Sequence, residues 1–235
     1  MRQLLMLGAI PALVACSGAD VSERAEEIAD RTALSASEAS EAVRATASKL
    51  EPMGEGVDLT TLPAGTYADE DGHAYIQFSY DHQGFSRPVL RWSEFDAVVD
   101  FDPADPSAST LRVEIPVDSI DSMVPVFDDH LKSADFFDAD QYPTITFEST
   151  SVDIGPGGTG TVTGNLTIKD ITRPVTLQGR VNKIGKHFRS GVDMFGISGT
   201  GSIKRSDFGV DKYTPSVGDE VDLVMEIEFQ RQESE

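Results

Sequence analysis

The chain contains few histidines and one cysteine, and their spacing suits neither catalysis nor metal binding. Four histidines occur in 235 residues, and no two of them have the His-x-x-x-His spacing of a helical metal site. Asp128, Asp129 and His130 are consecutive, so on a helix their side chains point in different directions. We expect Asp128 and His130 to hold a helix in place by hydrogen bonds to nearby loops. The sequence therefore predicts no catalytic residue, no metal site and no cofactor, with an enzyme kept only as an alternative.

Charge and composition exclude further classes of protein. The chain has 19 Lys and Arg against 40 Asp and Glu, a net charge of −21. Nucleic-acid binding and adsorption to anionic lipid both need clustered cations, so neither is expected. Apolar residues make up 39% of the chain, which is enough to build a core. The single cysteine rules out a disulfide within the chain and a cysteine-rich zinc site.

That cysteine lies at the end of an apolar N-terminal run. Residues 1–15 read as a signal peptide, because one arginine precedes an apolar stretch too short to span a membrane. The sequence Leu-Val-Ala-Cys at 13–16 resembles the lipobox of bacterial lipoproteins, which implies acylation of Cys16 and stable anchoring by several acyl chains. Ser17 resembles an outer-membrane sorting signal, so we expect a lipid-anchored protein of the bacterial cell envelope, on the outer membrane and facing the periplasm. An ordinary signal peptide ending beside a cysteine is the alternative.

The next segment differs in composition from the rest of the chain. Residues 16–61 are rich in Ala, Glu and Ser and contain no aromatic residue. They carry ten acidic against four basic side chains. Their apolar stripes are narrow, so any helix here is marginal by itself. We interpret residues 16–61 as a partly helical, lipidated, acidic tether, with a partner-binding helix as the alternative. Residues 232–235 form a short tail.

Residues 62–231 show the alternating pattern of a β-sheet with one apolar face. Between the runs lie turn sequences such as those at 102–106 and 155–158. Many short strands of this kind predict an antiparallel sheet closed as a sandwich or a barrel, and alternation alone does not choose between them. A short helical segment is expected around 122–140, where Val124, Phe127 and Leu131 have helical spacing. The alternating runs are 73–80, 111–117, 144–148, 162–169, 175–181, 197–203 and 221–229.

Five motifs in register give a resemblance to a known family. They are residues 73–86 (His-Ala-Tyr-Ile-Gln-Phe, then His-Gln-Gly-Phe-Ser), 128–137 (Asp-Asp-His-Leu-Lys-Ser-Ala-Asp-Phe-Phe), 142–147 (Tyr-Pro-Thr-Ile-Thr-Phe), 164–177 (Gly-Asn-Leu-Thr-Ile, then Thr-Arg-Pro-Val-Thr-Leu) and 204–209 (Lys-Arg-Ser-Asp-Phe-Gly). Together they resemble the YceI family, lipocalin-like barrels of the bacterial periplasm that bind polyisoprenoids. The resemblance implies an all-β, antiparallel eight-stranded barrel with a tunnel for a long apolar tail, and a possible homodimer.

Two positions depart from the pattern of that family. Phe127 stands where the family usually has an arginine, and Trp92 ends a Leu-Arg-Trp sequence where the family usually has Gly-x-Phe. We expect both changes to alter the mouth or the lining of the cavity.

From these patterns we predict a site and a function. Inward glycines at 164, 179, 199 and 201 favour a hollow barrel, although they would also serve barrel closure. The main hypothesis is a lipid-anchored carrier or store for a polyisoprenoid or isoprenoid-quinone-like amphiphile; the alternative is an envelope interaction or stress-response module whose lipid binding is incidental. The mouth is expected to be polar, formed by Ser86, Asn165, Lys169 and Lys204. The expected apolar lining is Ile76, Phe78, Tyr80, Val113, Ile115, Phe127, Leu131, Ile145, Phe147, Leu166, Ile168 and Leu177.

Overall fold

A computed structural model of the chain describes residues 56–155 and 157–233. The expected signal peptide (1–15), the acylation site Cys16, the tether as far as residue 55 and the last two residues of the tail lie outside this part of the chain. Within it, no helix has the length and the apolar character needed to cross a membrane.

The described residues are almost entirely β-structure. The ten strands are β1 (Gly65–His82), β2 (Val89–Trp92), β3 (Asp96–Phe101), β4 (Thr110–Pro116), β5 (Ile120–Asp121), β6 (Thr144–Ile154), β7 (Thr159–Ile168), β8 (Ile171–Lys186), β9 (Asp193–Lys204) and β10 (Val217–Arg231). One α-helix, α2 (Pro125–Lys132), and four 3₁₀ turns complete this part of the chain: η1 (Leu59–Thr61), η2 (Pro106–Ala108), η3 (Val117–Ser119) and η4 (Arg205–Phe208).

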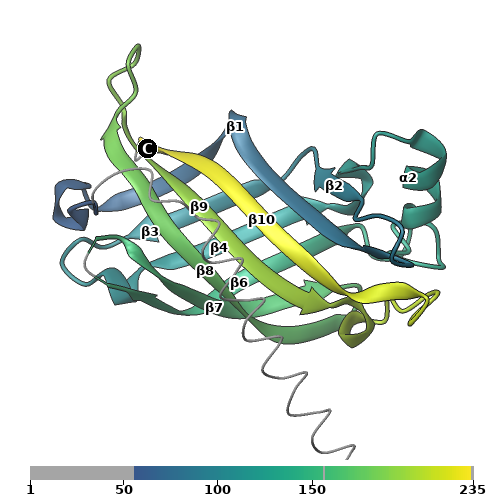
Figure 1. Ribbon diagram of the computed structural model, residues 1–235. Helices are drawn as coiled ribbons and strands as arrows, with labels where there is room; N and C mark the ends of the chain where they lie inside the picture. Colours follow the sequence, from purple (N-terminus) through teal and green to yellow (C-terminus); the bar gives the residue numbers. More distant parts are fainter. Residues whose placement is uncertain (1–55, 156, 234–235) are drawn as a thin grey trace, which may run out of the picture. The chain divides into compact units, whose positions relative to one another are not determined.

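Eight of the strands close into an antiparallel barrel (Figure 1). Following the hydrogen bonds, the order is β1, β3, β4, β6, β7, β8, β9 and β10, and β10 pairs with β1 to close the ring. The expected all-β, eight-stranded barrel is therefore confirmed. Closure satisfies the backbone groups that an open sheet would leave at its edges.

The first strand joins the barrel to a small side ribbon. Near its start, β1 pairs with β3, whereas residues 76–79 pair instead with β2. The short β2 in turn pairs with β5, which leads into α2. This arrangement places the β1–β2 turn and the helix at the same end of the barrel (Figure 1).

The helix is shorter than the expected segment at 122–140. It begins at Pro125, whose fixed φ and missing N–H suit a first helical position. It ends at Lys132, because the next residue, Ser133, has an extended backbone. The chain then continues in turns, in which the carbonyl of Ser133 accepts hydrogen bonds from the N–H groups of Phe136 and Asp138. Phe136 and Phe137 thus follow the helix instead of belonging to it.

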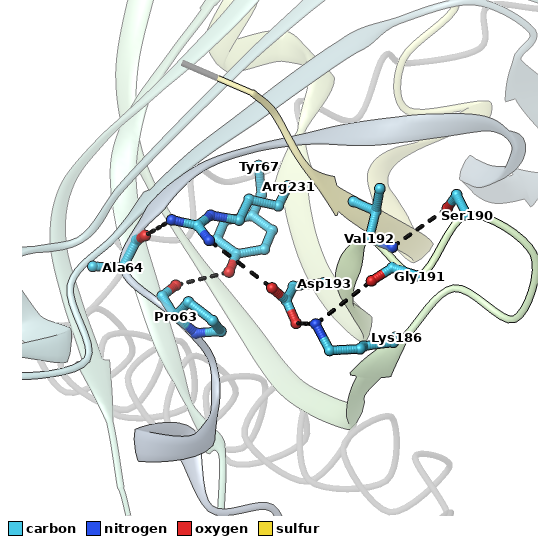
Figure 2. A network of polar contacts seen from close by, with 9 residues as sticks. All are labelled: Pro63, Ala64, Tyr67, Lys186, Ser190, Gly191, Val192, Asp193 and Arg231. Atoms are coloured by element: carbon cyan, nitrogen blue, oxygen red, sulfur yellow. Dashed lines mark hydrogen bonds and ion pairs between the residues drawn. The ribbon is translucent and has the colours of Figure 1, made fainter.

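Aromatic side chains fill the opposite end of the barrel. Tyr67, with no exposed surface, packs edge-on against Phe195 at 5.3 Å, and Phe195 stacks on Phe229 at 5.0 Å. Figure 2 shows how polar contacts hold this end: the Tyr67 hydroxyl donates to the carbonyl of Pro63 (2.7 Å), and Arg231 donates to the carbonyl of Ala64 (2.9 Å). Burial raises the pKa of the Tyr67 hydroxyl, so it stays a protonated donor.

The barrel is contacted by residues that precede the expected domain boundary at 62. Val57 pairs with Gly157 in the β6–β7 turn, and Leu59 in η1 packs against the core. The end of the segment that we interpreted as a tether is therefore part of the folded domain.

Candidate ligand-binding cavity

The interior of the barrel is hollow. It contains a cavity of about 430 Å³. Side chains from all eight barrel strands except β3 line it, together with residues of β2, α2 and η4. Almost all of them are aliphatic or aromatic, and among the described residues no Asp or Glu contributes to the lining. Such a cavity suits an apolar guest, and its volume lies in the range of about 300–1,000 Å³ typical of ligand pockets.

The structure brings all of the predicted apolar lining residues to this cavity. The alternation of the strands places them there: on β1, for example, Ile76, Phe78 and Tyr80 face inward. The residues that line the cavity as expected are Ile76, Phe78, Tyr80, Val113, Ile115, Phe127, Leu131, Ile145, Phe147, Leu166, Ile168 and Leu177.

None of the four residues predicted to form a polar mouth lines the cavity. Asn165 and Lys204 occupy outward positions of β7 and β9, and both are exposed. Ser86 is exposed in the β1–β2 turn. Lys169 lies in the tight β7–β8 turn with φ of 58°, and its ammonium donates to the carbonyl of Gly209 at 3.4 Å.

The actual mouth lies between the β1–β2 turn, α2 and the loop 209–216. Among the lining residues, His82 and Tyr213 are exposed, Tyr213 with 52% of its surface, and His130 beside them is half-buried. The ring of His130 lies 6.4 Å from that of Tyr213 and 5.1 Å from that of Phe136. Little in the sequence indicates Tyr213 as a lining residue, because it lies in a loop and outside any alternating run.

An ion pair connects the two sides of this mouth. Lys212 in the loop lies 2.9 Å from Asp135, which follows α2, and His130 lies 4.0 Å from the same carboxylate. The hydrogen bond with Lys212 lowers the pKa of Asp135 and raises the pKa of Lys212. Both groups are exposed, so the energy of the pair is modest, but it holds the loop against the turn after the helix.

Asp128 and His130, which we expected to hold the helix in place, have different surroundings. Asp128 does fix a loop, since its carboxylate accepts the N–H of Ser122 at 2.8 Å. His130 instead lies at the rim of the cavity and turns toward Phe136 and Tyr213. The loop 209–216 also borders the helix, on a side that helical periodicity does not reveal.

Arg205 is the one cation in the lining. It is 8% exposed, and four of its donor contacts go to backbone carbonyls: Gly218 (2.8 Å), Val210 (2.6 Å), Lys212 (2.9 Å) and Val217 (2.9 Å). Burial lowers the pKa of the guanidinium, and the charges of Asp219 and Asp211 oppose that shift. Arg205 thus ties the loop 209–216 to the start of β10.

Both departures from the family pattern contribute aromatic rings to the lining. Trp92 is buried and contacts Phe78 at 5.6 Å and Phe137 at 5.5 Å between ring centroids. Phe127, on α2, reaches the cavity from the mouth side. At both positions the chain therefore adds apolar surface to the lining.

The inward glycines divide into two groups. Gly179 and Gly199 line the cavity, and a Cβ built on Gly179 would have no neighbour closer than 3.7 Å. Gly164 and Gly201 do not line it, because side chains already occupy the adjacent space: a Cβ on Gly201 would lie 2.6 Å from Leu177. The expected link between inward glycines and free space thus holds for Gly179, whereas a Cβ on Gly199 would lie 3.0 Å from Cε of Met225.

Glu70 and His73 form an exposed ion pair on β1, outside the cavity lining. Within residues 56–155 and 157–233, no three His, Cys, Asp or Glu side chains are grouped so that they would hold a metal ion.

Fold and cavity together define a lipocalin-like barrel with an apolar interior. Residues 67–229 match the YceI-like domain, and the chain belongs to the YceI family. A UPF0312 protein of Azotobacter vinelandii is 36% identical over 172 residues, which cover 73% of this chain and 89% of that relative. Protein YceI of Shigella flexneri is 35% identical over 161 residues, covering 68% and 83% of the two chains.

Solved structures share the same fold. Burkholderia cenocepacia BcnA aligns with a TM-score of 0.62 and 29% identity, covering 68% of this chain and 98% of that one. A domain from Saccharophagus degradans, described as a polyisoprenoid binding domain implicated in plant cell wall breakdown, aligns with a TM-score of 0.56 over 72% of this chain and 100% of its own. At 10% identity the second likeness shows the shared fold alone.

Proposed function

We propose that this protein binds a polyisoprenoid or isoprenoid-quinone-like amphiphile in the cavity of its barrel. The observation that carries the proposal is the apolar cavity of about 430 Å³, closed by Tyr67, Phe195 and Phe229 at one end and open beside His82 and Tyr213 at the other. A long apolar tail gains about 0.8 kcal/mol per methylene removed from water, so such a space favours a chain-like guest. The name of the Saccharophagus degradans domain is consistent with a prenyl tail.

The proposal extends to the place where the protein acts. With Cys16 acylated, the barrel is held at the outer membrane on the periplasmic side, and it acts there as a carrier or a store. The support for this part is the sequence Leu-Val-Ala-Cys at 13–16 behind an apolar run. A lipid-anchored barrel with an apolar interior would shield a water-insoluble molecule within the envelope.

The test is organic extraction of the natively purified protein, followed by mass spectrometry. We expect one prenyl lipid per barrel, and we expect lipid-stripped protein to bind a prenyl quinone in a titration. A protein that yields no lipid and takes up no prenyl quinone would contradict the proposal, and would favour an interaction module whose barrel serves only as a scaffold.

A further inference from the structure

Exposed apolar side chains gather around the mouth of the barrel. In the described part of the chain, most of the large apolar side chains that reach solvent lie on the segments that border this opening. Three of them are almost fully exposed: Phe85 (85%), Val126 (81%) and Met123 (80%). A cluster of this kind marks a site of contact with a protein or a membrane. The mouth rim, as we call this surface, consists of Phe85, Val89, Met123, Val124, Val126 and Tyr213.

The backbone holds these side chains outward as separate tips. Phe85 lies in the β1–β2 turn, where its N–H donates to the carbonyl of the lining residue His82 at 3.0 Å. Met123 has φ of 63°, which is uncommon for a residue with a side chain, and its N–H donates to the carboxylate of Asp121 at 2.8 Å. Val126 lies in the first turn of α2, at the same end of the barrel as the β1–β2 turn (Figure 1). The rim is therefore a ring of protruding side chains and not a groove.

The charges beside the rim are paired. Arg91 lies 2.8 Å from Asp121, and Lys212 lies 2.9 Å from Asp135. These cations are already engaged by carboxylates, and the chain as a whole has a net charge of −21. Anionic lipid attracts clusters of cations and repels a protein of this charge. A zwitterionic bilayer offers an apolar interior without that repulsion.

The length of the N-terminal segment also favours a bilayer as the partner. The barrel joins this segment at Val57, which pairs with Gly157 in the β6–β7 turn. Residues 17–55 have a maximal reach of roughly 130 Å. The 15 residues of β10 span roughly 50 Å, so the reach exceeds the length of the barrel. With Cys16 acylated as proposed above, the mouth can meet the bilayer, and the linkage keeps the two at a high effective concentration.

We propose that the mouth rim is a docking surface for a zwitterionic phospholipid bilayer, into which Phe85, Met123 and Val126 insert. A fluid interface closes around separate tips, whereas a protein partner would need a matching hollow for each of them. The mouth then faces the acyl chains, and a guest passes between bilayer and cavity without crossing water. Docking itself needs no guest; only this route for the guest rests on the proposed function.

The experiment uses tryptophan reporters and brominated lipid, because bromine on acyl chains quenches a tryptophan that lies among them. Phe85→Trp places a reporter in the mouth rim. Phe188→Trp is the matched control, since Phe188 is 83% exposed in the turn 187–192, beside the contacts of the closed end in Figure 2. The full chain is bound to phosphatidylcholine vesicles with and without bromine. The wild type, whose single tryptophan Trp92 is buried, gives the background.

The two reporters should respond differently. We expect the added fluorescence of Phe85→Trp to fall about twofold or more in brominated vesicles, because an interfacial side chain lies at the level of the acyl chains. The added fluorescence of Phe188→Trp should stay unchanged. Brominated phosphatidylglycerol should quench Phe85→Trp less than brominated phosphatidylcholine does, because the chain is acidic.

A double substitution assigns docking to the rim. Met123→Ser together with Val126→Ser, made in the Phe85→Trp protein, should abolish the quenching. Both side chains are exposed, so thermal stability should change little. Tyr75→Ser in the same protein is the control, because Tyr75 is exposed on β1 outside the rim, and it should keep the full quenching.

Several results would overturn the docking surface. They are equal quenching of the two reporters, quenching of neither, stronger quenching by phosphatidylglycerol, and quenching that survives the double substitution. An oligomer of the wild type that the double substitution dissociates in vesicle-free solution would also do so, because a second copy would then cover the rim. Titration of lipid-stripped protein with a prenyl quinone separates the two proposals. Quinone binding without docking leaves the proposed function intact, whereas docking without quinone binding overturns that function and leaves the surface.

Discussion

The ring of Phe147 on β6 occupies the space where a side chain of Gly164 on β7 would begin. A Cβ on Gly164 would lie 2.4 Å from Cζ of Phe147 and 2.6 Å from the carbonyl oxygen of Glu148. Phe147 lines the cavity and Gly164 does not. The glycine therefore serves the close packing of these two strands, and the space it leaves is filled.

Gly164→Ala should destabilise the lipid-free protein by about 1–3 kcal/mol, because the new methyl overpacks against a ring and against backbone. Urea unfolding of the stripped protein measures the loss. An unchanged free energy of unfolding would show that the β6–β7 pair adjusts freely.

Gly179→Leu tests the hollow part of the barrel. Because Gly179 lines the cavity and has free space around its Cβ position, a leucine should enter the volume of the guest. We expect prenyl quinone binding to weaken by at least tenfold, with little change in lipid-free stability. Gly185→Leu is the control, since Gly185 lies on the same strand with its nearest contact at 3.9 Å and outside the lining. Equal effects of the two substitutions on binding would argue against a guest at Gly179.

Breaking the ion pair across the mouth should speed ligand release. Lys212→Ala and Asp135→Asn each remove a contact that holds the loop 209–216 against the turn after α2, so we expect dissociation a few times faster and little change in stability. Stopped-flow release of a fluorescent prenyl ligand measures this rate. Release rates that match the wild type would mean that the loop does not control the mouth.

The same pair predicts a pH dependence with a definite sign. The pKa of Asp135 is lowered below 3.8, so its contribution is present above that value and is lost as the pH falls through the lower folded-state pKa. The pKa of Lys212 is raised above 10.5, so its contribution is lost as the pH rises through the raised value. The difference in release rate between Asp135→Asn and wild type should therefore persist at neutral pH and shrink in acid.

Asp69→Asn should leave the protein as stable or more stable at pH 7. Burial is the main reason that the pKa of Asp69 is raised, while the N–H of Ala97 donates to its carboxylate at 2.7 Å. Because the folded-state pKa is raised, the ionised carboxylate costs stability at pH 7, and that cost disappears as the pH falls through the raised value. Asparagine keeps the acceptor without the charge. We expect a gain of at most about 1 kcal/mol, since the site is partly exposed; a clear loss in thermal denaturation would contradict this account.

Cys16→Ser should abolish lipidation and release the protein from membranes or leave it as a precursor. The basis is the lipobox-like sequence that ends at the only cysteine of the chain. Mass spectrometry of the mature wild-type N-terminus and membrane fractionation of the variant are the measurements. An unmodified thiol at Cys16 in the mature protein would count against the anchor.

The alternation in the sequence determined an antiparallel β-fold and the apolar lining of its interior, and the resemblance to the YceI family selected a barrel over a sandwich. Side chains of a strand alternate between two faces, so the period of two in runs such as 221–229 already assigns Leu223 and Met225 to the interior and Val224 to the surface. The predicted lining residues on the strands follow from this local rule, and Phe127 and Leu131 follow from the helical spacing of α2. Both rules depend only on neighbours along the chain.

Only the tertiary structure decided where the cavity opens and which glycines leave space. Arg205 and Tyr213 reach the cavity because β1, α2 and the loop 209–216, far apart in sequence, meet at one end of the barrel. Likewise, Gly164 and Gly179 both occupy inward positions of alternating runs, yet a ring from the adjacent strand fills the space beside the first and not beside the second. Such contacts depend on which strands are neighbours and on their register, and no local period carries that information.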